Sequence, residues 1–77
     1  MEARENVRGD RIRQLRLARG MTQADLAEAT GGLVSKQMIS RYERGESRPS
    51  PSVIEGLAEA FGVRAADLFR EPVAEVT

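Results

Sequence analysis

The chain of 77 residues carries twelve Arg or Lys and twelve Asp or Glu, so its formal net charge is zero. It contains no cysteine and no histidine, which excludes disulfides and thiolate metal sites and removes the commonest general base. A chain of this length makes one small domain, and no apolar run approaches the roughly 20 residues of a membrane span. We therefore expect no enzyme, no cofactor and no metal site. The charged N-terminus is unlike a signal peptide, so we expect a cytoplasmic protein.

The charges are unevenly distributed along the chain. Residues 8–48 carry nine Arg or Lys and five Asp or Glu, a balance of +4. Residues 49–77 carry two against five, a balance of −3, and residues 1–7 carry one against two, a balance of −1. A polarised field can steer a charged partner, whereas the alternative is that these charges only keep the surface soluble.

The N-terminal segment, residues 1–9, shows no periodicity and is expected to be a flexible, inert arm. A first helix is predicted over about residues 10–18. Ile12 and Leu15 fall near one face of this helix, with Arg16 beside them, so that face is expected to lie against the core.

A second helix is predicted over about residues 22–30. Thr22 is suited to cap its first turn, and Asp25, three residues on, can reach back in a capping box. Gly31 and Gly32 are expected to end the helix, because glycine tolerates the left-handed conformation found at helix ends.

A third helix is predicted over about residues 35–44, with Ser35 at its start. Its inward stripe consists of Met38, Ile39 and Tyr42, and core packing of Tyr42 is favoured over stacking on a base. The opposite face is polar and can lie in a DNA major groove, although a merely solvated face is the alternative. That face consists of Lys36, Gln37, Ser40, Arg41 and Arg44.

A loop is predicted over residues 45–51, followed by a fourth helix. Ser50 is its expected cap and Pro51 its first residue, where the missing N–H of proline has no cost. The apolar residues of this helix recur at helical spacing and predict a core face. They are Val53, Ile54, Leu57, Ala58 and Phe61.

A short fifth helix is predicted over about residues 65–69. Arg64 stands where a Ser or Thr cap is usual, so we expect weak capping. Leu68 should close the core, whereas Phe69 is left open between the core and a contact with a second subunit. Residues 71–77 are expected to be a tail or the start of a linker.

Three segments together resemble the phage-repressor (Cro/Xre-type) helix-turn-helix domain. They are RIRQLRLARGMTQADLAEATG at 11–31, SKQMISRYERGESRPS at 35–50, and the apolar segments LAEAFGV and ADLF. The resemblance implies an all-α fold over residues 10–70, a compact five-helix bundle of the lambda-repressor-like type. Its second and third helices would form the helix-turn-helix. The chain departs from the family in its turn, which is about two residues longer and contains Gly32, Leu33 and Val34.

The resemblance also implies a function: a sequence-specific DNA-binding transcriptional regulator, most simply a repressor, that reads the major groove with residues 35–44. Base reading is assigned to Ser35, Lys36, Gln37, Ser40 and Arg41, and phosphate contact to Gln23, Arg44 and Arg48. The family pairs an arginine of the first helix with a glutamate of the recognition helix, which implies a structural ion pair between Arg16 and Glu43. Phosphate contact by Arg16 is the less favoured alternative.

The expected partner is double-stranded DNA with a palindromic operator, bound by a homodimer. Whether the two copies associate only on the DNA is left open. The protein would then be associated with the nucleoid. Two alternatives remain: an antitoxin-type regulator that binds a protein as well as DNA, and the DNA-binding module of a longer multidomain regulator. An enzyme has little support, because no carboxylates cluster at catalytic spacing.

Overall fold

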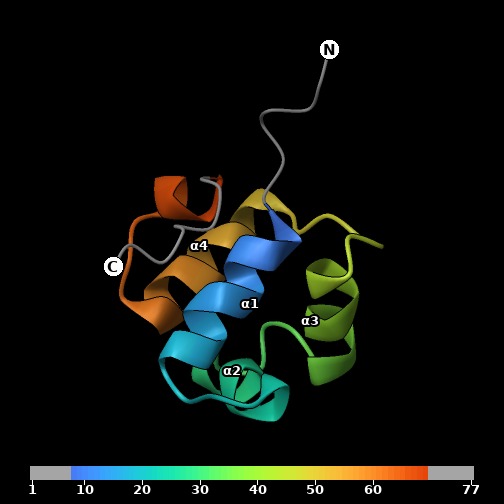
Figure 1. Ribbon diagram of the computed structural model, residues 1–77, viewed down its shortest axis with the longest axis vertical. Helices are drawn as coiled ribbons and strands as arrows, with labels where there is room; N and C mark the ends of the chain where they lie inside the picture. The colour runs from blue at the N-terminus through green and yellow to red at the C-terminus, as the bar shows by residue number, and fades with distance from the viewer. Residues whose placement is uncertain (1–7, 70–77) are drawn as a thin grey trace, which may run out of the picture.

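The computed structural model describes residues 8–69, which form four α-helices and one short 3₁₀ helix and contain no β-strand (Figure 1). The elements are α1 Gly9–Ala18, α2 Gln23–Ala29, α3 Lys36–Glu43, α4 Pro51–Phe61 and η1 Ala65–Phe69. The all-α prediction is thus confirmed for these residues. The expected tail, residues 71–77, and all but the last two residues of the expected arm lie outside them. None of the helices over residues 8–69 is long and apolar enough to cross a membrane.

The prediction of five α-helices is wrong in its last element, because residues 65–69 form a 3₁₀ helix. The amide of Asp67 donates to the carbonyl of Arg64 at 2.9 Å, an i to i+3 bond that is typical of this tighter helix. The Asp67 carboxylate in turn accepts from the N–H of Arg64 at 3.2 Å. The turn has no Ser or Thr cap, and the Asp67 carboxylate supplies only the reciprocal half of a capping box.

The three other caps are where the sequence places them. The hydroxyls of Thr22, Ser35 and Ser50 accept hydrogen bonds from the amides of Asp25, Met38 and Val53. In α2 the Asp25 carboxylate also accepts from the N–H of Thr22 at 2.9 Å, which completes the capping box. These local bonds satisfy amides that a helix start leaves free, so each helix begins at a defined residue.

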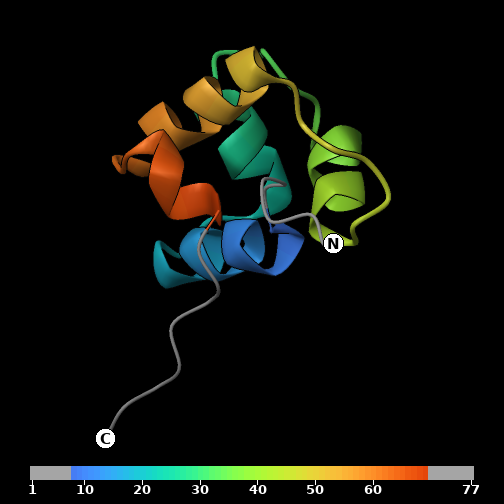
Figure 2. The same cartoon turned by 90° about the horizontal axis from the view of Figure 1, so that it is seen from above.

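The core lies between all five elements. Its buried side chains are Ile12, Leu15, Leu26, Val34, Ile39, Tyr42, Leu57, Ala58, Phe61 and Leu68. Tyr42 is only 6% exposed, as the core interpretation requires. Around this core α3 packs against both α1 and α2, while α4 packs against α2 and η1 (Figure 2). The helix-turn-helix is therefore attached to the rest of the molecule on both sides.

The two ends of the described chain meet. The amide of Arg8 donates to the carbonyl of Leu68 at 3.1 Å, and the Arg11 guanidinium donates to the carbonyl of Asp67 at 3.0 Å. Helix α1 begins at Gly9, one residue before its expected start. Arg8 and Gly9, which were expected to belong to the arm, are thus held against the folded part of the chain.

The capping box makes the stability of the fold depend on pH. The pKa of Asp25 lies below its ordinary value of 3.8. The main cause is the hydrogen bond from the backbone N–H of Thr22, and a hydrogen bond with the Thr22 side chain lowers the pKa further. A lowered folded-state pKa stabilises the fold above the unfolded pKa, and this stabilisation is lost as the pH falls through the folded value. We expect Asp25→Asn to lower the Tm at neutral pH, and the difference from the wild type to shrink below about pH 4.

Thermal melts between pH 7 and pH 2 measure this dependence. Glu28→Gln is the matched control, since it removes one negative charge from the same helix, where the Glu28 side chain is exposed and makes no hydrogen bond within residues 8–69. A Tm difference for Asp25→Asn that stays constant down to pH 2 would show that the cap does not depend on the charge.

Candidate nucleic-acid interface

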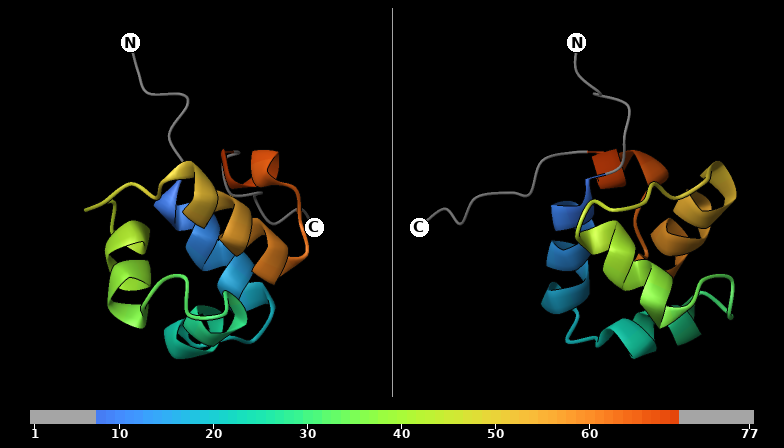
Figure 3. Two further views of the ribbon diagram at one scale, coloured as in Figure 1. Left: turned by 180° about the vertical axis from the view of Figure 1, so that it is seen from behind. Right: turned by 90° about the vertical axis from the view of Figure 1, so that its right-hand side faces the viewer.

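The exposed face of α3 presents donors that no other residue of the described part of the chain uses. In Figure 1 this helix stands at the right of the molecule, and in the right-hand view of Figure 3 it lies across the front of the other helices. Lys36, Gln37 and Arg41 are exposed on it, and none of them has a side-chain hydrogen bond or ion pair within residues 8–69. An ammonium, an amide and a guanidinium are thus free to meet a ligand along one helix face.

The two serines assigned to base reading are already engaged. Ser35 is exposed and accepts from the amide of Met38 as the cap of α3. Ser40 is half-buried, and its hydroxyl oxygen accepts from the guanidinium of Arg44. Each hydroxyl keeps its proton to donate, but its orientation is restricted by the bond it accepts. The accessible donors are therefore Lys36 and Gln37 on the first turn and Arg41 on the next.

The two arginines assigned to phosphate differ in their surroundings. Arg44 forms a bidentate pair with Glu46, with Nε–Oε2 and Nη2–Oε1 distances of 2.8 and 3.0 Å. This pair lowers the pKa of Glu46 and raises that of Arg44. Arg48 is exposed in the following loop and has no partner within residues 8–69. A phosphate could bind the guanidinium of Arg48 without displacing another group. At Arg44 it would compete with the Glu46 carboxylate.

The structure brings Arg16 of α1 and Glu43 of α3 together beneath this surface. Arg16 Nε lies 2.7 Å from Glu43 Oε2, and Arg16 Nη2 lies 3.0 Å from Oε1. The third nitrogen, Nη1, donates to the carbonyl of Met21 at 2.9 Å. Their side chains are only 9% and 4% exposed. The Glu43 carboxylate accepts from the Arg16 guanidinium and raises the pKa of Arg16 further, so the guanidinium stays charged and the pair ties α3 to α1.

Gln23, at the start of α2, joins the same group. Its Nε2 donates to Glu43 Oε1 at 3.1 Å. Because the acceptor is a carboxylate oxygen, only the NH₂ end of the amide can face it, so the orientation of the amide is fixed. One N–H remains to donate elsewhere. Sequence reasoning missed this bond, since nothing in the local pattern relates two residues twenty positions apart.

The close approach of Gly9 to α3 was also missed. A Cβ added at Gly9 would collide with the carbonyl oxygen of Tyr42 and would lie 2.9 Å from that of Glu43. The first residue of α1 therefore lies directly against the C-terminal end of α3. A glycine immediately before a predicted helix was the available signal, but glycines occur at helix starts for other reasons.

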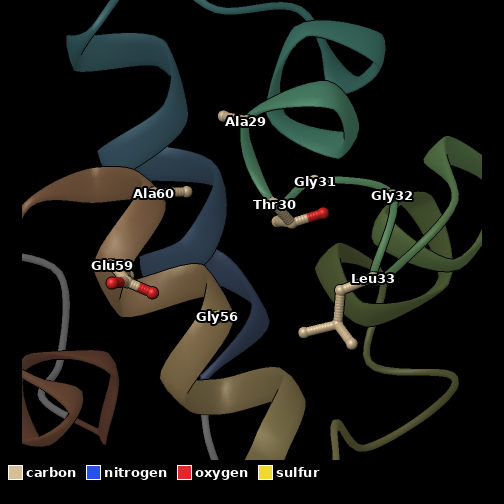
Figure 4. Close-up of a pocket in the computed structure, with 8 residues that line it drawn as sticks. All are labelled: Ala29, Thr30, Gly31, Gly32, Leu33, Gly56, Glu59 and Ala60. Carbon is tan, nitrogen blue, oxygen red and sulfur yellow. The ribbon is translucent and has the colours of Figure 1, made fainter.

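The turn between α2 and α3 is the part that we expect from the sequence to be longer than the family pattern. Gly31 and Gly32 have φ values of 72° and 82°, which is the left-handed region that glycine tolerates, so helix α2 ends as expected. Val34 is buried in the core, whereas Leu33 is 50% exposed. Figure 4 shows the side chain of Leu33 extending from this turn toward α4, beside an open pocket of about 410 Å³.

Comparison with known proteins agrees with this geometry. The helix-turn-helix family matches residues 12–68. An HTH-type transcriptional regulatory protein of Pyrococcus furiosus is 36% identical over 74 residues, which cover 92% of this chain and 23% of that protein. An uncharacterized HTH-type transcriptional regulator of Archaeoglobus fulgidus is 39% identical over 59 residues, covering 77% and 81% of the two chains.

A solved structure with a similar fold and sequence supports the same family. The restriction-modification controller protein C.AhdI from Aeromonas hydrophila superposes with a TM-score of 0.73 at 33% identity, covering 78% of this chain and 84% of that one. The chain spans less than a quarter of the Pyrococcus relative but most of the Archaeoglobus relative and of C.AhdI. The resemblance found in the sequence is confirmed, and the chain belongs to the helix-turn-helix family.

Proposed function

We propose that this protein is a sequence-specific DNA-binding transcriptional regulator, most simply a repressor, that inserts α3 into the major groove. One observation carries the proposal: the first turn of α3 presents the unpaired donors of Lys36 and Gln37, on a helix held from behind by the buried pair of Arg16 and Glu43. Rigid support matters because base reading needs donors placed within hydrogen-bonding distance of particular base edges.

The free side chains match the chemistry of base edges. The Lys36 ammonium can donate to O6 and N7 of guanine, and the Gln37 amide can both donate to N7 and accept from N6 of adenine. Arg41, one turn later, can reach a base or the backbone. Ser35 and Ser40 contribute at most one donated hydrogen bond each, because their oxygens already accept.

The phosphate contacts are assigned to three residues around this helix. Arg48 supplies an unpaired charge, and Gln23 supplies an N–H whose direction is fixed by Glu43. Arg44 contributes once its ion pair with Glu46 has opened, or by donating to Glu46 and a phosphate at the same time. The local excess of positive charge over residues 8–48 supports attraction to DNA although the net charge is zero.

Two copies are proposed to bind one palindromic operator, because a helix-turn-helix dimer places its recognition helices one helical turn apart. The test begins with selection of duplexes from a random library by the 77-residue chain, followed by hydroxyl-radical footprinting on the selected duplex. We expect a palindrome protected at two half-sites about 34 Å apart.

The possible outcomes test specific DNA binding, binding by two copies and the antitoxin-type alternative separately. Failure to enrich any sequence would contradict specific DNA binding. Protection of a single asymmetric half-site would contradict binding by two copies while leaving base reading intact. Co-purification of one defined protein with the chain expressed in its own host would instead favour the antitoxin-type alternative.

A further inference from the structure

Helix α4 contains a glycine in its middle that its own geometry does not require. Gly56 is the sixth residue of Pro51–Phe61, and its φ is not positive. Glycine within a helix is less favourable than alanine, because more backbone freedom is lost on folding. A glycine at such a position commonly marks a place where another group approaches the backbone closely.

The group that approaches Gly56 is Leu33 of the long turn. A Cβ at position 56 would lie 2.5 Å from Leu33 Cδ2 and 3.9 Å from Cγ, and no other atom in the described chain outside the neighbouring helix backbone would lie within 4 Å. Figure 4 shows the two residues facing each other, one on the turn and one on α4. The absent side chain at Gly56 thus makes the space that Leu33 occupies.

The contact between Leu33 and Gly56 lies close to the start of α3. Gly31 and Gly32 are exposed, and Cβ atoms added to them would meet nothing within 4 Å. The amides of Gly32 and Leu33 donate to the carbonyls of Ala27 and Thr30 within the turn. The side chains that attach the turn to other elements are Val34, which is buried in the core, and Leu33, which contacts α4. Ser35, which caps α3, follows two residues after Leu33. A shift of Leu33 on α4 would therefore also move Ser35, and with it the first turn of the recognition helix.

We propose that Leu33 and Gly56 form a positioning pair that fixes the longer turn on α4 and thereby sets the register in which α3 meets DNA bases. The inference rests on the proposed function and identifies two specificity-determining residues that touch no DNA.

The contact itself is tested by a stability cycle that does not involve DNA. In the Leu33→Ala background an alanine at 56 meets no clash, so Gly56→Ala should raise the Tm by about 4–8 °C, the shift expected from the helix preference of alanine in a domain of this size. In the wild-type background the same change displaces Leu33, and the Tm should change by less than half as much. An equal rise in both backgrounds would overturn the contact.

The positioning role is tested by the ratio of affinities for the selected duplex and for a scrambled duplex of the same composition. We expect Gly56→Ala and Leu33→Ala each to lower this ratio about tenfold, with affinity for the scrambled duplex unchanged. Leu33→Met, which keeps a long apolar side chain, should retain most of the wild-type ratio. General loss of folding would lower both affinities, so a change in the ratio alone reports positioning.

The two proposals fail in different ways. If the wild type prefers the selected duplex and both variants keep its ratio, the positioning role is wrong while the proposed function stands. If the wild type itself shows no preference, the proposed function fails and the positioning role fails with it. Selection repeated with Gly56→Ala should enrich a different sequence or none, and enrichment of the wild-type sequence at equal strength would contradict the inference.

Discussion

Replacing Arg16 by alanine is expected to lower the free energy of unfolding by about 3–5 kcal/mol. The change leaves the Glu43 carboxylate, whose side chain is 4% exposed, with the Gln23 amide as its one remaining side-chain partner among residues 8–69. It also removes the donor to the carbonyl of Met21. Small domains are stable by only about 5–15 kcal/mol, so this variant should be close to unfolding at room temperature. Urea denaturation of Arg16→Ala, Glu43→Ala and the double variant measures the effect.

The exposed pair of Arg8 and Asp10 provides a matched control. Their side chains are 41% and 55% exposed, so Asp10→Ala should cost about 0–1 kcal/mol. In the Arg16 and Glu43 cycle the double variant should lose clearly less than the sum of the two single losses, because each single change leaves the other charge buried. Small and additive losses would show that the pair does not stabilise the fold.

Gly9→Ala is expected to destabilise the protein by about 1–3 kcal/mol, although alanine is the better helix former. The new methyl group would overlap the carbonyl oxygen of Tyr42 and crowd that of Glu43. Both carbonyls belong to the last turn of α3, and backbone cannot move aside as a flexible side chain can. Helices α1 and α3 must therefore separate at this end.

Thermal melts of Gly9→Ala and Arg13→Ala test this expectation. Arg13 is exposed on the same helix and has no side-chain partner within residues 8–69, so its replacement should change stability by less than about 0.5 kcal/mol. A Gly9→Ala variant that melts at or above the wild-type temperature would mean that the two helices do not approach as closely as described.

The helices could be predicted from sequence because their signals are local. Thr22, Ser35 and Ser50 each precede an apolar pattern of helical period, and each caps a helix in the structure. The segment at 65–69 has the same apolar pattern but is only five residues long, and such a pattern does not distinguish an α-helix from a 3₁₀ helix. The hydrogen bond from the N–H of Arg64 to the Asp67 carboxylate had no counterpart in the prediction.

The contacts that hold α3 and its neighbouring turn in place could not be predicted from the local pattern of residues along each helix. The pairing of Arg16 with Glu43 was implied by family resemblance alone. The contacts of Gly9 with α3, of Gln23 with Glu43 and of Leu33 with Gly56 join residues that are far apart in the sequence. Such contacts depend on how the helices cross, which the periodicity of each helix leaves undetermined. The exposed residues of α3 were predictable because they are those that the apolar stripe leaves outside.

The central claim, that α3 reads bases while the loop after it contacts phosphate, is tested most directly by binding isotherms of Gln37→Ala and Arg48→Ala. Each variant is measured on the selected and the scrambled duplex at several salt concentrations. Gln37→Ala should lose about 1–3 kcal/mol on the selected duplex and much less on the scrambled one. Arg48→Ala should lose equally on both and flatten the log–log salt slope by about 1. Equal losses of Gln37→Ala and Lys36→Ala on both duplexes would contradict base reading by the first turn of α3. A selective loss for Arg41→Ala alone would then show that the helix reads from its second turn.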